Sequence, residues 1–257
     1  MKNLEEFIGV ESPFLSTGLR LIDDRWDGLS ESRLILIESD DSVANTCLMS
    51  NIIVNTAGKA PIAAFLAKLK AVDLMNCAIS NYANIDINNI LFGVNSGMFS
   101  AIVEATRYFA ESTQLKIDDS DQMSAKSIMD RLERSTDEIK PRLVVVDDIL
   151  SLASEPVSQP ERSIENTVNA LKAYAKNNKC TVIAFLSKGQ IADCFKSLPK
   201  HERFLDALDF ASQVSDVHAQ VSIKEGIFEI DTIKNRYGLS GIDQLKANLR
   251  KSRIEDF

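Results

Sequence analysis

The residues whose types and spacing could do chemistry begin in a short turn, residues 38–46, between an apolar run at 33–37 and a helical stretch. In α/β proteins ligands bind at such turns, beyond the carboxyl ends of strands. A phosphate-binding turn needs glycines, a lysine that reaches the β- and γ-phosphates, and a hydroxyl for magnesium. Here Thr46 supplies the hydroxyl, whereas Asn45 occupies the lysine position and Ala44 that of the preceding glycine.

The charge of this turn also argues against a phosphate. Glu38, Asp40 and Asp41 precede Ser42, where the helix-side half of the turn starts. Two like charges about 4 Å apart near a protein surface repel by ~4 kcal/mol. The sequence therefore predicts no cofactor, with weak Mg-ATP binding as the most that the turn could support. A plain strand-turn-helix connection without ligand is the alternative.

A second candidate is a carboxylate at the end of a buried strand. The apolar run 143–146 ends in Asp147, and P-loop NTPases hold magnesium on an aspartate in this kind of position. Together Asp147 and Thr46 form a vestigial magnesium site. No metal site is predicted elsewhere, because His201 and His218 have no partners at metal-ligand spacing.

Two groups of basic residues stand out from an acidic chain. Lys234 and Arg236 lie two apart at the end of a predicted strand, which places them on one face. The other group lies within residues 187–212 and consists of Lys196, Lys200 and Arg203. With 29 basic and 37 acidic residues the net charge is −8, which excludes a chain-wide nucleic-acid surface and leaves only a local one. For both groups, solvated surface charge is the alternative.

Strand-like and helix-like segments alternate along the chain. Strands are predicted at 33–37, 61–66, 116–119, 143–148 and 180–186, helices at 46–57, 71–81, 98–112, 124–134 and 163–177, and a hairpin at 217–233. This order predicts an α/β fold with three layers, a mainly parallel central sheet and a C-terminal antiparallel hairpin. The basic residues at 246–253 are expected on an exposed helical face. One domain is expected over 14–257, with 1–13 as a stub.

Composition sets the class of protein. Of 257 residues, 45% are hydrophobic and 26% are charged, so the chain is globular rather than disordered. No apolar run approaches the ~18 residues of a membrane span, so no membrane association is expected. The four cysteines are scattered and the N-terminus has no signal-peptide pattern, which favours a cytoplasmic location.

Taken in order, these segments resemble the RecA-like C-terminal motor domain of DnaB-type replicative helicases. The similarity runs from an opening segment at 15–29, through the turn and Asp147 at the Walker A and Walker B positions, to the final segment 226–241. It covers residues 14–257 and implies a RecA-like P-loop NTPase fold. It also implies that 1–13 is a linker remnant and that the family's N-terminal primase-binding domain is absent.

The departures from the family pattern concern catalysis. The Walker A motif is degenerate at Ala44 and Asn45, the catalytic glutamate of the family falls at Lys68, and its sensor glutamine falls at Ser187. The resemblance implies that Lys234 and Arg236 reach a neighbouring subunit's γ-phosphate, as arginine fingers do. It further implies that the basic group around Arg203 faces DNA.

Three hypotheses follow. The first is a pseudo-ATPase that serves as an interaction or regulatory subunit in DNA replication or recombination. Its partner would be a replicative helicase, a loader or another copy of itself in an oligomer. The alternative is a DNA-dependent ATPase or helicase in which Lys68 or another basic residue replaces the missing lysine, because lysine is a mobile point charge that can come from elsewhere. The third is a single-stranded DNA-binding module that uses the loops at 187–209.

Overall fold

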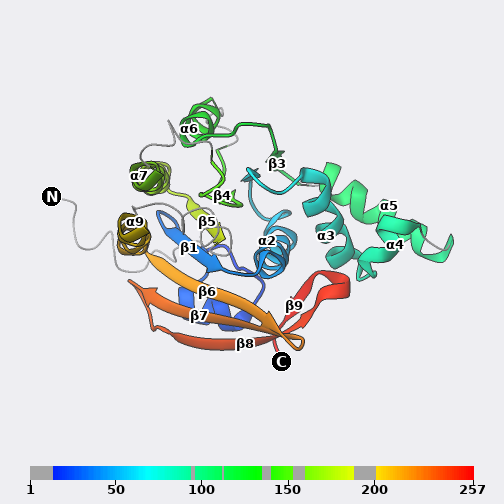
Figure 1. Cartoon of the computed structure of the whole chain (residues 1–257). Coiled ribbons are helices and arrows are strands. Elements are labelled where there is room, and N and C mark those ends of the chain that lie inside the picture. The colour runs from blue at the N-terminus through cyan, green and yellow to red at the C-terminus, as the bar shows by residue number, and fades with distance from the viewer. Residues whose placement is uncertain (1–13, 94–95, 112, 135–139, 153–159, 188–200) are drawn as a thin grey trace, which may run out of the picture.

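The computed structural model describes residues 14–257 except 94–95, 112, 135–139, 153–159 and 188–200, and these residues form a nine-stranded sheet in the order β3-β2-β4-β5-β1-β6-β7-β8-β9 (Figure 1). Helices cover both faces, as the three-layer prediction requires. The α/β class, the mainly parallel sheet and the antiparallel C-terminal part are confirmed.

Six strands form the parallel part of the sheet. They are β1 (Leu34–Ser39), β2 (Ile62–Phe65), β3 (Leu115–Asp118), β4 (Leu143–Val146), β5 (Thr181–Ser187) and β6 (Val217–Lys224). Every residue of β1, β4 and β5 is buried, which explains why they read as continuous apolar runs. Their carboxyl ends meet at one edge of the sheet, where the candidate site residues are expected.

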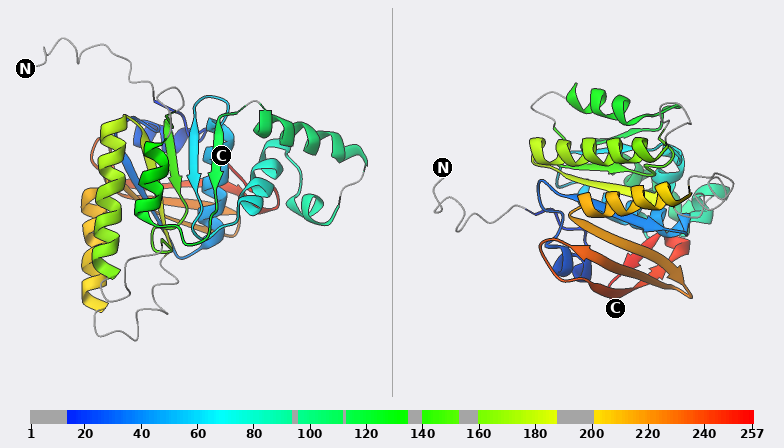
Figure 2. Two further views of the ribbon diagram at one scale, coloured as in Figure 1. Left: turned by 90° about the horizontal axis from the view of Figure 1, so that it is seen from above. Right: turned by 60° about the vertical axis from the view of Figure 1, so that its left-hand side comes forward.

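The helices divide between the two faces. One face carries α1 (Arg20–Trp26), α2 (Ser42–Thr56) and α3 (Ala71–Ala83), and the other carries α6 (Ala125–Glu133), α7 (Pro160–Asn178) and α9 (His201–Val214). Two further helices, α4 (Ile87–Phe92) and α5 (Ser96–Glu111), extend sideways from α3 (Figure 2). No helix within the described ranges is long and apolar enough to cross a membrane.

The C-terminal part is larger than the predicted hairpin. After β6 come β7 (Ile227–Asn235), β8 (Gly241–Asn248), the 3₁₀ turn η3 (Leu249–Lys251) and β9 (Arg253–Glu255), and the three strands are all added antiparallel. The predicted helical face at 246–253 is therefore wrong. Leu245 pairs with Phe228 of β7 and is buried, so long-range strand pairing decides the structure of this segment.

Helix starts differ in how well local sequence predicts them. The predicted cap of α6 is confirmed, because Ser124 Oγ accepts the amide of Ser127 and Ser127 Oγ accepts the amide of Ser124. In contrast, α2 begins at Ser42, four residues before the predicted start at Thr46. The sequence does not predict the two short helices α1 and α4, since neither is long enough to show a clear apolar periodicity.

Candidate functional site

The turn at the Walker A position is capped by a side chain of its own, that of Asp41. Only Asp40 and Asp41 separate β1 from α2. Asp41 is the N-cap of α2, and its carboxylate accepts the amide of Val43 at 2.8 Å while its carbonyl accepts the amide of Asn45 at 3.3 Å. Amides at a helix N-terminus are a usual binding place for phosphate. Here a carboxylate of the same chain occupies that place, and this cap is also why α2 starts early.

Of the two residues that would contact a nucleotide's phosphates and magnesium, Asn45 is buried and Thr46 is bonded to its own helix. Thr46 donates its hydroxyl hydrogen to the carbonyl of Ser42 at 2.9 Å. Asn45 is only 4% exposed, and neither atom of its side-chain amide has a hydrogen-bond partner. A buried polar group without a partner costs about 1–3 kcal/mol. Ala44 is fully buried in the core.

Replacing Asn45 by leucine is therefore expected to stabilise the fold. Asn45→Leu removes an unsatisfied amide and keeps the number and branching of the side-chain heavy atoms, and we expect the free energy of unfolding to rise by about 1 kcal/mol or more, measured by urea denaturation. The matched control is Asn51→Leu on the same helix. Asn51 bonds Cys47 O, Ser252 O and Ile254 N, so its loss destabilises. A lowered midpoint for Asn45→Leu would mean that its amide has an unseen partner.

Glu38, at the end of β1, contacts β6 directly and α9 through His218. Its Oε2 lies 2.8 Å from His218 Nε2 on β6, and His218 Nδ1 lies 2.8 Å from Ser212 Oγ on α9. Both Glu38 and His218 are buried. His218 is thus a bonded core histidine rather than a metal ligand, and it holds a carboxylate at the candidate site.

Beside this turn lies an acidic cavity of about 240 Å³. Five of its lining side chains are carboxylates, namely Glu38, Asp40, Asp41, Glu229 and Asp231. None of the His, Cys, Asp and Glu side chains in the described part of the chain forms a group of three or more arranged to hold a metal ion. The cavity therefore concentrates negative charge beside the turn at the Walker A position.

Asp147 is bonded to the turn after β2. Its carboxylate accepts the amides of Ala67 at 2.7 Å, Lys68 at 3.0 Å and Leu69 at 2.6 Å. Burial raises the pKa of Asp147, and the three amide bonds oppose that rise. Burial likewise raises the pKa of Asp148, which accepts the amide of Leu150 at 3.1 Å.

Two other predicted residues also lie at this edge of the sheet. The exposed side chain of Lys68 is close enough to Asp148 to counteract part of the rise in the pKa of Asp148. Ser187 is buried at the end of β5, opposite Ser39 in the register of β1 and β5. The structure therefore brings Lys68, Asp148 and the backbone-bound Asp147 together.

Lys234 and Arg236 lie near each other around the end of β7, but only Lys234 is held by backbone carbonyls. Lys234 Nζ donates to the carbonyls of Ser212, Gln213 and Ser215, at 2.7–2.8 Å, and so caps the C-terminus of α9. Burial and the charge of Arg236 lower the pKa of Lys234. Because β7 ends at Asn235, the strand alternation stops before Arg236, whose side chain is 48% exposed.

Asp216, directly before β6, is bonded to several segments around it, and sequence reasoning missed it. Its fully buried carboxylate accepts the amide of Leu34 at 2.8 Å, pairs with Lys172 of α7 and lies 3.7 Å from Arg236 Nη1. The sequence feature that could have pointed to Asp216 is its position directly before a predicted strand. The remaining predicted basic residues are not placed: Lys196 and Lys200, and the side chain of Arg203 on α9, lie outside the described residues.

Comparison with known proteins identifies the family. The model of the DnaB-like helicase C terminal domain matches residues 15–191, more than half of the chain. The chain belongs to this family. The DnaB-like domain is 25% identical over 272 residues to the replicative DNA helicase DnaB of Haemophilus influenzae, and 25% identical over 258 residues to that of Pasteurella multocida. These alignments cover 100% and 94% of this chain but only 58% and 55% of the relatives.

Solved structures agree on the fold. The DnaB-like domain superposes on one solved ATPase domain with a TM-score of 0.82 at 16% identity, covering 98% of this chain and 95% of that one. For a DnaB-like replicative helicase studied with primase the TM-score is 0.81 at 15% identity, covering 98% and 66%. The RadB recombinase gives 0.60 at 15% identity, covering 95% and 100%. The fold is thus RecA-like.

Proposed function

We propose that this DnaB-like domain is a pseudo-ATPase that serves as an interaction or regulatory subunit in DNA replication or recombination. The observation that carries the proposal is the carboxylate of Asp41 on the amide of Val43, at the N-terminus of α2. A triphosphate would have to displace this carboxylate and then remain beside an acidic cavity without a lysine from α2.

The remaining residues support the same proposal. To bind magnesium, Thr46 would have to give up its bond to Ser42 O, and Asp147 its bonds to the amides that follow β2. Asn45 offers no positive charge. The residues present therefore do not fit Mg-ATP, and we derive no hydrolysis step at this site.

Calorimetric titration of Mg-ATP into the purified chain tests the proposal, with a titration of magnesium alone as the blank. We expect no binding at millimolar nucleotide and near-physiological salt. A micromolar Kd would overturn the proposal and favour the alternative ATPase. In that event Lys68→Ala should remove binding that Asn45→Ala leaves intact, because Lys68 is the exposed cation beside Asp148.

The partner in this proposal is a DnaB-type helicase, a loader or a second copy of the chain. One similar structure is of a DnaB-like helicase and its interactions with primase, so protein partners are known for such a helicase. Arg236 is the member of the basic pair that could act on a partner, since the three ammonium hydrogens of Lys234 are bonded to α9.

A stimulation assay tests whether Arg236 acts on a partner. With DnaB of Haemophilus influenzae as the trial partner, we expect the wild-type chain to raise its ATPase rate and Arg236→Ala to abolish that increase. Lys246→Ala, which removes an exposed cation from β8, is the control and should stimulate like wild type. Stimulation that survives in Arg236→Ala would contradict a role of Arg236 in the partner's site.

A further inference from the structure

The strand β3 lies at one end of the sheet and pairs with β2 alone (Figure 1). The carbonyls of Gln114 and Asp118 accept amides from β2 and from the residue after it, at 3.0 and 2.8 Å. Because the backbone groups of successive residues point to opposite edges of a strand, the N–H and C=O groups of Leu115 and Ile117 point away from β2. In the part of the chain that the structure describes, no group forms a hydrogen bond with them.

The two helices next to β3 in the chain pack on the faces of the sheet rather than on this edge. On one face, α5 contributes Ala105 and Phe109 to the core, and on the other face α6 contributes Ile128 and Leu132. The edge of β3 therefore lies open between two covered faces. An extended segment can join a sheet at such an edge as one further strand.

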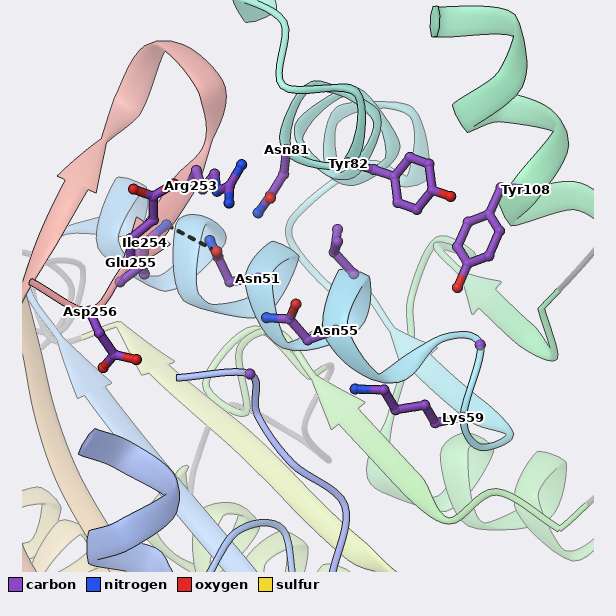
Figure 3. A pocket seen from close by; sticks show the side chains of 13 residues that line it. Asn51, Asn55, Lys59, Asn81, Tyr82, Tyr108, Arg253, Ile254, Glu255 and Asp256 are labelled. Carbon is purple, nitrogen blue, oxygen red and sulfur yellow. Dashed lines mark hydrogen bonds and ion pairs between the residues drawn. The ribbon is translucent and has the colours of Figure 1, made fainter. Parts of the chain in front are cut away.

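The opposite end of the sheet is closed by side chains. There β9 is the outermost strand, and Asn51 Oδ1 of α2 accepts the amide of Ile254 at 3.0 Å (Figure 3). The carbonyl of Ser252, just before β9, accepts the side-chain amides of Asn51 and Asn81 at 2.9 and 3.0 Å. Proteins often cover an edge in this way, because an open edge can pair with another chain. Among the described residues β3 has no such cover, so it is the edge that is available to a partner.

A cavity of about 550 Å³ lies beside β3, between this strand and α6. Its charged lining side chains are Lys116, Asp118, Asp119, Arg131 and Arg134. Arg131 pairs with Asp118, and Asp119 accepts the first amide of α3 at 2.9 Å. Three cations against two carboxylates leave an excess of positive charge, and Lys116 and Arg134 carry it on exposed side chains.

The two faces of β3 complement different side chains of an added strand. Asp118 pairs with Arg131 of α6, so Lys116, two residues earlier, lies on the same face. Leu115 and Ile117 alternate with them and pack against the core on the face of α5. A lysine on an edge strand opposes pairing with most other strands, because its charge has to be matched. A strand with acidic side chains on the cavity side and apolar side chains on the other side matches both faces.

We propose that the open edge of β3 binds an extended segment of a partner protein in which acidic side chains alternate with apolar ones. The backbone of that segment bonds the outward groups of Leu115 and Ile117, and its acidic side chains lie beside Lys116 and Arg134. Main-chain bonds of this kind supply affinity, and the alternate side chains supply specificity. The inference does not rest on the proposed function, because three strands separate β3 from β1 and its turn.

Fluorescence anisotropy with labelled peptides of about seven residues, the length of an ordinary strand, tests the proposal. In the probe valine and glutamate alternate, and the comparison peptide has lysine in place of each glutamate. We expect the glutamate peptide to bind with a Kd below about 1 mM, and the lysine peptide to bind at least about tenfold more weakly at low salt.

Variants and amide exchange locate the bound peptide. Lys116→Glu should weaken binding of the glutamate peptide about tenfold or more, because it places like charges side by side. Lys126→Glu makes the same charge change on α6, outside the cavity, and should bind like wild type. In hydrogen exchange followed by NMR, the peptide should slow exchange at the amides of Leu115 and Ile117. The amides of Lys116 and Asp118, which already face β2, should keep their exchange rates.

Four results would each overturn the proposal. Two concern the peptides: no binding of the glutamate peptide at about 1 mM chain, or equal binding of the glutamate and lysine peptides. The third is binding by Lys116→Glu at the wild-type affinity. The fourth is a bound peptide that slows exchange at the amides of β9 and not at those of Leu115 and Ile117. Circular dichroism of both lysine variants excludes loss of folding as the cause of weaker binding.

Discussion

Restoring the lysine alone, in Asn45→Lys, is expected to leave the chain without measurable Mg-ATP binding. The new ammonium would enter a turn where Asp41 is bonded to the amide of Val43, beside a cavity lined by five carboxylates that include Asp41. An ion pair within the turn would neutralise the lysine before a phosphate could use it.

Opening the turn as well should change the result. In the triple variant Asp41→Gly, Ala44→Gly, Asn45→Lys the amide of Val43 is free, and glycine allows the backbone to wrap around a phosphate. We expect Mg-ATP affinity to rise at least about tenfold over Asn45→Lys, measured by calorimetry. The variant Asp41→Gly, Ala44→Gly, without lysine, is the control. Micromolar binding by Asn45→Lys alone would show that Asp41 does not close the site.

The largest loss of stability is expected from Asp216→Ala. This change leaves the amide of Leu34 and the ammonium of Lys172 without their buried acceptor. Removing one partner of a buried ion pair costs about 3–5 kcal/mol. Because Lys172 is 21% exposed and gains some hydration, we expect about 3 kcal/mol, near the lower end of that range.

Urea denaturation of matched variants checks this value. Asp121→Ala removes an exposed carboxylate 3.6 Å from Lys70 and should cost less than about 1 kcal/mol. Asp216→Asn retains an oxygen for the amide of Leu34 and should fall between the two. Equal midpoints for Asp216→Ala and Asp121→Ala would refute the assignment of Asp216 as the central acceptor.

The parts of the fold that sequence could predict are those fixed by short-range pattern. The runs that form β4 and β5 are buried on both faces, and such runs have few alternatives. The cap at Ser124 is a local hydrogen-bond pattern and can be predicted for the same reason. The assignment of Ala44 and Asn45 to the glycine and lysine positions of the family motif rests on Thr46 and the preceding strand, and it stays a prediction.

What could not be predicted depends on contacts between distant segments. Lys234 is bonded to carbonyls of α9 some twenty residues earlier, which its spacing from Arg236 does not reveal. The segment at 246–253 pairs with β7 and with itself rather than forming a helix. Asp216 likewise contacts Leu34, Lys172 and Arg236, which come from three distant segments that no local motif joins.

The cap of α2 has a consequence for how the domain responds to its surroundings. Asp41 is attached two residues from the amide that it binds, so its carboxylate is present there at an effective concentration far above that of a free nucleotide. A rise or fall in the cellular nucleotide pool would leave such an internal ligand in place. If the turn binds no nucleotide, as we propose, its conformation is set at folding and stays constant.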